Sequence, residues 1–369
     1  MARIAWVSAE TPDRNGQGGQ RRQYHQIRSL SSLGHHISTY TPHGAQDDKS
    51  LREVAAVHRP RLHIRGRSIP LRKHILGRKL ASPEWDAVIV AHHESMKLLP
   101  NRTCAPVLLD IHNVASRWHA VHGRDAAASH EKALLDAAIA RVDVCSTCSD
   151  TETTRLVTMH PSAAGKVFTA PLGIDPSEWP TREYSRTSPR VALFGSWNWE
   201  PNARGLEWFL ADVWPKVRSL RVDAEAKIAG VPPDEIPRLP SGVEFVGRVA
   251  DLATFTANAT VVAVPVIGGV GAPMKFAEAL ASGSSVCATP DGANAFADTG
   301  AFVADDPQRW AAWIAARLEN RFAEPIPAAT RARALELFTW DRAVVPIDDW
   351  VTSLSRMRPN GEGLWGDAT

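Results

Sequence analysis

One pattern runs twice along this chain of 369 residues: a short apolar segment, a loop rich in glycine or polar residues, then an amphipathic helical segment. Such alternation is typical of parallel, doubly wound sheets with helices on both faces. A proline-containing, charged connector, 176–189, separates the two runs. The sequence therefore predicts an α/β protein of two Rossmann-like domains, 1–175 and 188–338. The segments expected as strands are 3–9, 35–42, 85–93, 105–112, 142–148, 167–175, 190–196, 223–230, 243–247, 260–266, 284–289 and 301–305.

Composition is ordinary for a water-soluble α/β protein and excludes several other classes. The chain is 44% hydrophobic and 22% charged with a formal charge of +2, so no nucleic-acid partner is expected. Cys145 and Cys148 lack a second ligand pair, and a capping box at residues 149–152 follows them, so we expect them to pack. No cluster of His, Asp and Glu has metal-ligand spacing, and no metal is expected. The N-terminus meets acid and proline too early for a signal peptide, which predicts a cytoplasmic location.

The loop and helix at 268–283 combine features of an anion site. Gly268, Gly269 and Gly271 allow a ligand close to the backbone, and the following helix directs its free N–H groups there. Lys275 adds a full charge in the first helical turn, and Glu278 follows on the same face. The alternative is a solvated lysine paired with Glu278 at i, i+3, worth a few tenths of a kcal/mol.

The loop after the first strand, residues 10–22, is rich in glycine but fits no standard nucleotide motif. Gly16, Gly18 and Gly19 are followed by Arg21 where a dinucleotide fingerprint needs its third glycine, and no Walker lysine motif occurs. The predicted role is a mobile loop that, with Arg21 and Arg22, closes over a phosphate or sugar from the other domain. A turn without function is the alternative.

Polar residues also follow three further strands. Asp110, His112 and Asn113 end one strand, and His92 and His93 end another, where a histidine can move a proton or bind a sugar hydroxyl. A histidine that only bonds a neighbouring turn is equally consistent with these positions. In 194–205 the candidates are Gly195, Asn198, Asn202 and Arg204, whereas Trp197 and Trp199 are expected mainly to pack.

The stretch 59–80 carries eight basic residues and no acid. Its second part places Leu71, Ile75, Leu76 and Leu80 at helical spacing, typical of a helix at an anionic membrane surface. The alternative, slightly favoured, is a solvated face whose apolar stripe packs on the sheet.

Several segments in order resemble the GT-B glycosyltransferases, most closely the retaining, nucleotide-sugar-dependent family four. They are "GQGGQRR" with "LSSLGHHISTYTP", "CSTCSDTE", "APLGID", "FGSWNWEPNARGLEWF", "VEFVGRVADL" and "GVGAPMKFAEALASGSSVCATPDG", spanning nearly the whole chain. The resemblance implies two domains facing across a cleft, a C-terminal helix (339–356) that returns to the first domain, and a disordered tail (357–369).

The resemblance also implies functional roles. His112 and Lys275 would be catalytic, and His92, His93 and Asn113 would face the acceptor. A UDP-sugar or GDP-sugar donor, with no cofactor, would contact Gly18, Gly19, Gly195, Asn198, Arg204, Gly247, Arg248, Gly268, Gly269, Val270, Gly271, Lys275 and Glu278. Glu278 would bind the ribose, Lys275 and the loop amides the diphosphate, and Gly247 and Arg248 the base.

One position departs from the family pattern. Many members carry a glutamate eight residues before the one matching Glu278, and Val270 stands there, which leaves the donor sugar open. Transfer with retention is implied, the departing phosphate taking the acceptor's proton. The acceptor is open between a saccharide, a lipid-linked molecule and a natural product. The alternatives are a non-catalytic nucleotide-sugar-binding or scaffold subunit and, less favoured, a phosphorylase or epimerase on the same fold.

Overall fold

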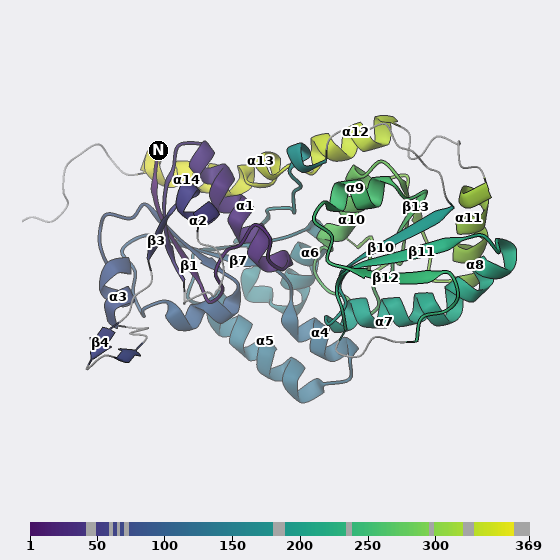
Figure 1. Cartoon of the computed structure of the whole chain (residues 1–369). Helices are drawn as coiled ribbons and strands as arrows, with labels where there is room; N and C mark the ends of the chain where they lie inside the picture. The colour runs from purple at the N-terminus through teal and green to yellow at the C-terminus, as the bar shows by residue number, and fades with distance from the viewer. Residues whose placement is uncertain are drawn as a thin grey trace, which may run out of the picture.

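The computed structural model describes residues 1–41, 49–58, 62–64, 67–69, 74–179, 189–233, 238–294, 299–319 and 328–357. Two parallel sheets, each with helices on both faces, lie next to each other (Figure 1). The expected fold, a GT-B pair of Rossmann-like halves, is confirmed.

The first sheet has seven parallel strands in the order β3-β2-β1-β6-β7-β8-β9. Its central strands are continuous apolar runs because helices cover both faces. The strand order reverses between β1 and β6, so the carboxyl ends of these strands form the ligand-binding edge. The strands are β1 (Arg3–Ser8), β2 (His36–Tyr40), β3 (Ala56–His58), β6 (Ala87–Ala91), β7 (Val107–Ile111), β8 (Val144–Thr147) and β9 (Val167–Thr169), and the α-helices are α1 (Gly18–Ser32), α2 (Lys49–Val54), α3 (His74–Leu80), α4 (Ala115–Val121), α5 (Asp125–Ile139) and α6 (Asp150–Met159).

The second sheet has six parallel strands in the order β12-β11-β10-β13-β14-β15, with its reversal between β10 and β13. The helical segment that follows β10 is not continuous: a π-helical turn, Phe209–Val213, divides it into Glu200–Trp208 and Trp214–Leu220. Pro215 has no N–H to continue an α-helical ladder there. The elements are β10 (Arg190–Ser196), β11 (Glu225–Val231), β12 (Val243–Gly247), β13 (Val261–Val264), β14 (Ser285–Ala288), β15 (Phe302–Val303), α7 (Glu200–Trp208), α8 (Trp214–Leu220), α9 (Leu252–Ala257), α10 (Met274–Ala281), α11 (Pro307–Glu319) and α12 (Ala328–Leu337).

The C-terminal helices α13 (Trp340–Ala343) and α14 (Val345–Met357) lie against the first sheet, beside α1 (Figure 1). Val344, Ile347 and Val351 belong to the same apolar core as residues of β1 and α1. The chain crosses between the halves at Thr339, which bridges to Ile174. The tail, 358–369, lies outside the described residues.

Two further expectations have structural outcomes. Cys145 and Cys148 are free, buried thiols, so the packing interpretation is confirmed. In the basic stretch, Leu76 and Leu80 of α3 are buried in the core of the first half, which agrees with the apolar stripe packing on the sheet. Leu71 and the side chain of Ile75 lie outside the described residues, as do 59–61, 65–66 and 70–73. The short β3 and the antiparallel pair β4 (Leu62–Ile64) and β5 (Arg67–Ile69) were not anticipated.

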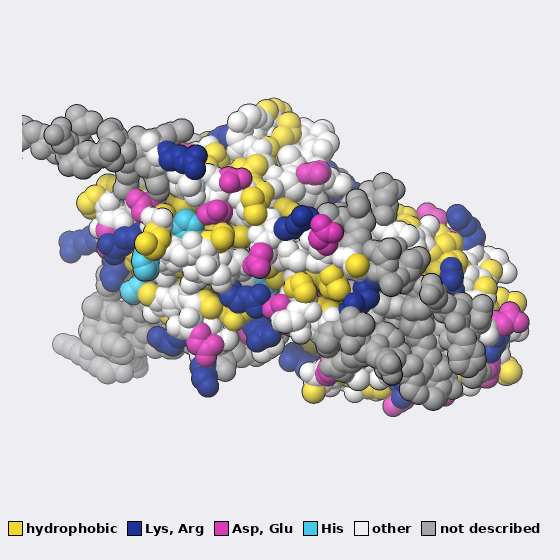
Figure 2. All heavy atoms as spheres, turned by 90° about the horizontal axis from the view of Figure 1, so that it is seen from above, with side chains coloured by type: hydrophobic (Ala, Val, Ile, Leu, Met, Phe, Trp, Pro, Cys, Tyr) yellow, Lys and Arg dark blue, Asp and Glu magenta, His cyan; other side chains and the backbone are white. Residues whose placement is uncertain are grey.

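No helix within the described residues is long and apolar enough to cross a bilayer. On the face drawn in Figure 2, basic and acidic side chains alternate over the coloured surface. The cytoplasmic location and a membrane contact of 59–80 stay predictions from the sequence.

Candidate active site

The glycine loop before α10 approaches the first half closely. Gly271 has a φ of 80°, and a Cβ there would lie 3.1 Å from the carbonyl oxygen of His112. A side chain would therefore be both strained and obstructed at this point. The Gly271 carbonyl accepts a hydrogen bond from Asn294, whose amide oxygen accepts from Arg155 of α6. This loop is thus held where the two halves meet.

Lys275 occupies the first turn of α10, and its side chain is half-buried. Its Nζ donates to Asn202 Oδ1 at 2.7 Å and lies 5.0 Å from the centre of the Trp197 ring. A Cβ at Gly195 would lie 2.7 Å from Nζ, so glycine at the end of β10 leaves room for the amine. Burial lowers the pKa of Lys275 to about 7, partly offset by Glu278. The amine has N–H groups to spare for an anion, since this contact uses one of three donors.

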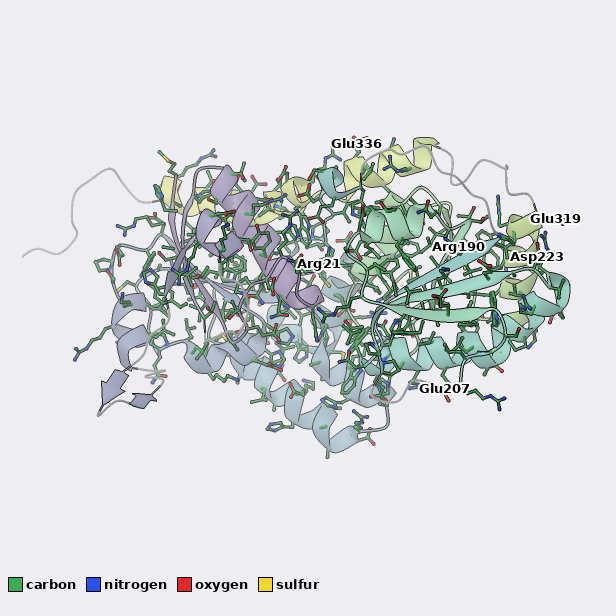
Figure 3. The ribbon with its side chains drawn as sticks, in the orientation of Figure 1. Arg21, Arg190, Glu207, Asp223, Glu319 and Glu336 are labelled. Atoms are coloured by element: carbon green, nitrogen blue, oxygen red, sulfur yellow. The ribbon has the colours of Figure 1, made fainter. Side chains whose placement is uncertain are left out.

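Glu278 does not form the i, i+3 pair considered from the sequence. Its Oε1 lies 2.6 Å from Nη1 of Arg21, in the first turn of α1, and its side chain is 4% exposed. The negative charge of Glu278 raises the pKa of Arg21, and burial of the guanidinium opposes this rise. The carboxylate expected to bind ribose is therefore held by an arginine of the other half. Figure 3 places Arg21 at the end of α1 that faces the second half.

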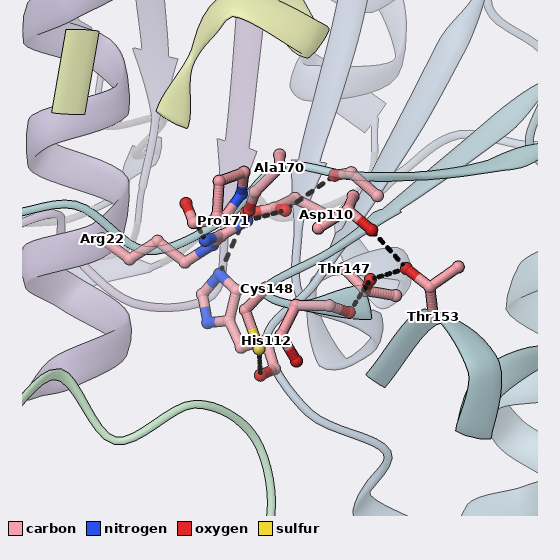
Figure 4. Close-up of polar contacts among 11 residues, drawn as sticks. Arg22, Asp110, His112, Thr147, Cys148, Thr153, Ala170 and Pro171 are labelled. Atoms are coloured by element: carbon pink, nitrogen blue, oxygen red, sulfur yellow. Dashed lines mark hydrogen bonds and ion pairs between the residues drawn. The ribbon is translucent and has the colours of Figure 1, made fainter. Parts of the chain in front are cut away.

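Arg22, expected to close over a ligand, instead holds the first half together. Its Nη2 and Nε donate to the two carboxylate oxygens of Asp110 at 2.7 and 3.0 Å, and Nη2 also donates to the carbonyl of Ala170 (Figure 4). Burial would raise the pKa of Asp110, but the charge of Arg22 and contact with His112 hold it well below its ordinary value. Arg22 is thus a structural residue, because its guanidinium is buried and donates to Asp110, Ala170 and Pro171 within the first half.

His112 directly follows β7, and its ring lies between Asp110 and the start of α1. Its Nε2 lies 3.4 Å from Asp110 Oδ2, while Nδ1 would lie 3.0 Å from a Cβ at Gly19. In the tautomer that carries its proton on Nε2, the nitrogen nearer the carboxylate, Nδ1 is a hydrogen-bond acceptor. Gly18 and Gly19, expected in a loop, are the first residues of α1, because Gln17 and Gln20 form a capping box there.

The histidine pair after β6 divides between two environments. His92 is hydrogen-bonded with Asn113, and its ring lies 5.3 Å from that of His112. Burial, then the neighbouring His112, lower its pKa well below the ordinary value. The backbone φ of His92 is 62°, and no other described residue except glycines has a positive φ. His93 is buried and contacts Glu131 of α5 at 2.8 Å, so it has a structural partner, although that partner is a distant helix and not the neighbouring turn considered from the sequence.

The other predicted residues differ in how near they lie to this site. Arg204 flanks Gly268, and Val270 is buried in the loop. The Gly268 amide already donates to Asp291 at 2.8 Å, so it is not free for a ligand. Trp197 is fully buried and donates to the Ala229 carbonyl, which confirms packing rather than stacking on a sugar. Asn198 and Arg248 are exposed, Gly247 ends β12, and Gly269 lies against Val266.

Asn202 was among the candidates expected from the sequence, but its contact with Lys275 was not anticipated. Asp291 and Asn294, which fix the glycine loop, were missed. Among the described residues, no group of three His, Cys, Asp or Glu side chains is placed to bind a metal ion.

Family models match both halves of the chain. "Glycosyltransferase Family 4" matches residues 16–178, and "Glycosyl transferases group 1" matches residues 188–320. The chain is a glycosyltransferase of the family 4 type. Arg21, Asp110 and His112 of this glycosyltransferase lie within the first match, and Asn202, Lys275 and Glu278 within the second.

Solved structures agree with this assignment at the level of the fold. Sucrose-phosphate synthase from Thermosynechococcus elongatus aligns with a TM-score of 0.75 and 16% identity, over 97% of this chain and 100% of that one. HepE from Anabaena, in complex with UDP-glucose, aligns with a TM-score of 0.70 and 14% identity, over 96% of this chain and 100% of that one. A mutant of TarM from S. aureus, in complex with Fondaparinux, α-GlcNAc-glycerol and UDP, aligns with a TM-score of 0.73 and 10% identity, over 96% of this chain and 100% of that one. No curated protein matches the glycosyltransferase in sequence.

Proposed function

We propose that the protein transfers a sugar from a UDP-sugar or GDP-sugar to an acceptor, with retention of configuration. The observation that carries the proposal is Lys275, a half-buried amine with one hydrogen bond, one helical turn from the buried carboxylate of Glu278. A partly desolvated cation with spare donors favours an anion, and a buried carboxylate can accept from ribose hydroxyls. HepE with UDP-glucose and TarM with UDP, which share the fold, support a nucleotide-sugar donor.

The residues divide the work between donor and acceptor. Lys275, with the positive end of α10, would stabilise the negative charge that builds on the departing diphosphate. Glu278 would orient the ribose, and His112 would lie near the reacting carbon with Nδ1 as an acceptor. His92 and Asn113, which lie beside His112, would contact the acceptor.

Retention fits a reaction in which the leaving phosphate takes the acceptor's proton on the same face of the sugar. Such a reaction needs a stabilised phosphate and a positioned hydroxyl, and no pair of protein carboxylates flanking the bond. The glycosyl bond breaks as the acceptor oxygen bonds to the anomeric carbon, and the nucleoside diphosphate leaves with the proton. His92, kept neutral by burial, would accept a hydrogen bond from the incoming hydroxyl without competing for the charge.

The test is calorimetric titration with UDP, GDP, ADP and CMP, followed by incubation of the matching sugar donors with candidate acceptors. One nucleoside diphosphate is expected to bind, and Lys275→Ala to weaken it about 10- to 150-fold, as loss of a charge-assisted contact implies. Lys216→Ala is the control, since the amine of Lys216, in α8, donates to the carbonyl of Asp212 in the preceding π-helical turn. The anomeric proton of the product reports retention.

Absence of binding by all four nucleotides would contradict the proposal. Donor binding without transfer or hydrolysis would favour a non-catalytic subunit.

A further inference from the structure

Arg21 connects the two halves at the carboxylate that the donor would use. Its Nη1 lies 2.6 Å from Glu278 Oε1, and its side chain is 23% exposed against 4% for the carboxylate. An ion pair this well shielded from solvent is costly to break without a replacement partner, because each charge is left unpaired. A ribose bound at Glu278 therefore competes directly with Arg21.

The backbone that carries Arg21 is firmly positioned. Arg22, the next residue, is anchored in the first half through both carboxylate oxygens of Asp110. The capping box of Gln17 and Gln20 fixes the turn of α1 that precedes it. Displacement from Glu278 would thus rotate the Arg21 side chain within the site rather than withdraw the helix.

A second anion would be present within reach of that side chain. Lys275 lies three residues before Glu278 on α10, and residues at this spacing have Cβ atoms about 5–6 Å apart on one helix face. A diphosphate bound by Lys275 would thus lie beside the carboxylate that Arg21 holds. Lys275 contributes at most one positive charge, and its burial reduces that charge near neutrality. A diphosphate carries more than one negative charge, and a planar guanidinium can bind it through two donors.

We propose that Arg21 is a donor-binding residue that exchanges partners, pairing with Glu278 in the empty protein and with the donor's diphosphate when the ribose occupies Glu278. The exchange leaves Arg21 paired with an anion in both states, while Glu278 replaces its ion pair with hydrogen bonds from the ribose hydroxyls. It also makes the first half part of the donor site, so that donor binding and approach of the two halves are coupled. This inference rests on the proposed donor function.

The experiment separates the two roles of Arg21 by comparing ligands with and without phosphate. The nucleoside diphosphate selected by the wild-type titration and its parent nucleoside are measured against wild type, Arg21→Ala and Arg21→Lys, the nucleoside by competition. Arg14→Ala is the matched control, because Arg14 forms a similar ion pair with Glu178 at 2.7 Å without touching Glu278. Thermal unfolding of each variant verifies that it is folded.

In Arg21→Ala, the nucleoside is expected to bind several-fold more tightly, because its ribose no longer competes with a guanidinium. The diphosphate is expected to bind at least about tenfold more weakly, because a charge-assisted contact is lost. Arg21→Lys should recover part of the diphosphate affinity, and Arg14→Ala should match wild type for both ligands.

Other outcomes would overturn the exchange. Tighter binding of both ligands by Arg21→Ala would mean that Arg21 only blocks the site. Equal weakening of both affinities would mean that Arg21 only positions the halves. Unchanged affinity for both ligands would mean that its ion pair with Glu278 has no part in donor binding. Each of these outcomes overturns the exchange but leaves the proposed donor function standing. If the wild-type protein binds no nucleotide, both the donor function and the exchange are overturned.

Discussion

Lys275 and Asn202 join the first turn of α10 to the first turn of α7 through a hydrogen bond of 2.7 Å. The amide of Asn202 is itself fixed, because its Nδ2 donates to the Ser196 carbonyl at the end of β10. The Lys275 amine is thus held in place before any ligand arrives, and a neutral amide does not neutralise its charge. A preorganised donor of this kind costs little reorganisation when negative charge develops nearby.

Nucleoside diphosphate binding should weaken as the pH rises above about 7. The pKa of Lys275 is lowered to about 7 by burial in the free protein, and an adjacent diphosphate should raise it again. Binding above pH 7 then requires uptake of about one proton, so the dissociation constant should rise by up to about tenfold per pH unit until the raised pKa is reached. Titrations in buffers of different ionisation enthalpy would measure the uptake.

Lys275→Met is the control for that pH dependence. Its binding should be weaker at every pH and should take up no proton. The same substitution should reduce the pH dependence of stability. A lysine whose folded pKa is depressed loses stability as the pH falls from about 10.4 to about 7, and methionine has no such loss. Proton uptake retained by Lys275→Met would assign the titration to another group.

Gly19→Ala should impair transfer, whereas Gly18→Ala should leave it unchanged. A Cβ at Gly19 would lie 3.0 Å from Nδ1 of His112, but one at Gly18 has nothing within 4 Å. Both residues lie in the first turn of α1, so alanine should raise stability by about 0.4–1 kcal/mol at Gly18. We expect at least a tenfold lower kcat for Gly19→Ala, measured beside urea-unfolding curves of both variants. Equal activity of the two variants would show that His112 tolerates displacement.

Asp110→Asn should destabilise the protein by about 3–5 kcal/mol, because it leaves the buried guanidinium of Arg22 without its counter-charge. Replacing both partners by Arg22→Met with Asp110→Leu should cost less than Asp110→Asn alone, since no buried charge remains. Urea unfolding followed by tryptophan fluorescence would measure the wild type and the two variants. A double variant that is no more stable than Asp110→Asn would mean that the unpaired charge is not the main cost, contrary to the two hydrogen bonds between these side chains.

His25 should make the protein acid-sensitive. Its ring is buried and stacks on Trp340 with centroids 4.9 Å apart, and burial, reinforced by Arg28, lowers its pKa to about 3. The unfolded chain takes up this proton near pH 6.5, so stability should fall between pH 6.5 and 3 by up to about 1.4 kcal/mol per pH unit. His25→Phe retains the stack and should flatten this part of the pH–stability curve. An unchanged slope would place the acid sensitivity elsewhere.

Local patterns predicted the sheets well because buried parallel strands are continuous apolar runs. The segments expected as strands at 85–93, 105–112 and 260–266 contain β6, β7 and β13, which end within a few residues of the expected limits. The place of Lys275 in the first turn of α10 follows from the same local signal, a glycine loop before an amphipathic helix.

Contacts between the halves could not be predicted in this way. Arg21 and Arg22 are adjacent and chemically identical, yet one reaches Glu278 of the second half and the other Asp110 of the first. Successive residues on a helix point about 100° apart, so their partners depend on how the domains meet. His92 and His93 differ for a similar reason: the chain turns at His92, and only the ring of His92 stays beside His112.

The bridge between Ile174 and Thr339 has a mechanical consequence. The two chain segments that connect the halves run next to each other there, so the halves are tethered along one line. Relative motion that preserves this bridge is a rotation about that line, and translation of one half away from the other would break it. Arg124 and Glu200 form an ion pair between the halves, so rotation about that line should separate them. A spectroscopic label pair at these two positions would therefore report opening.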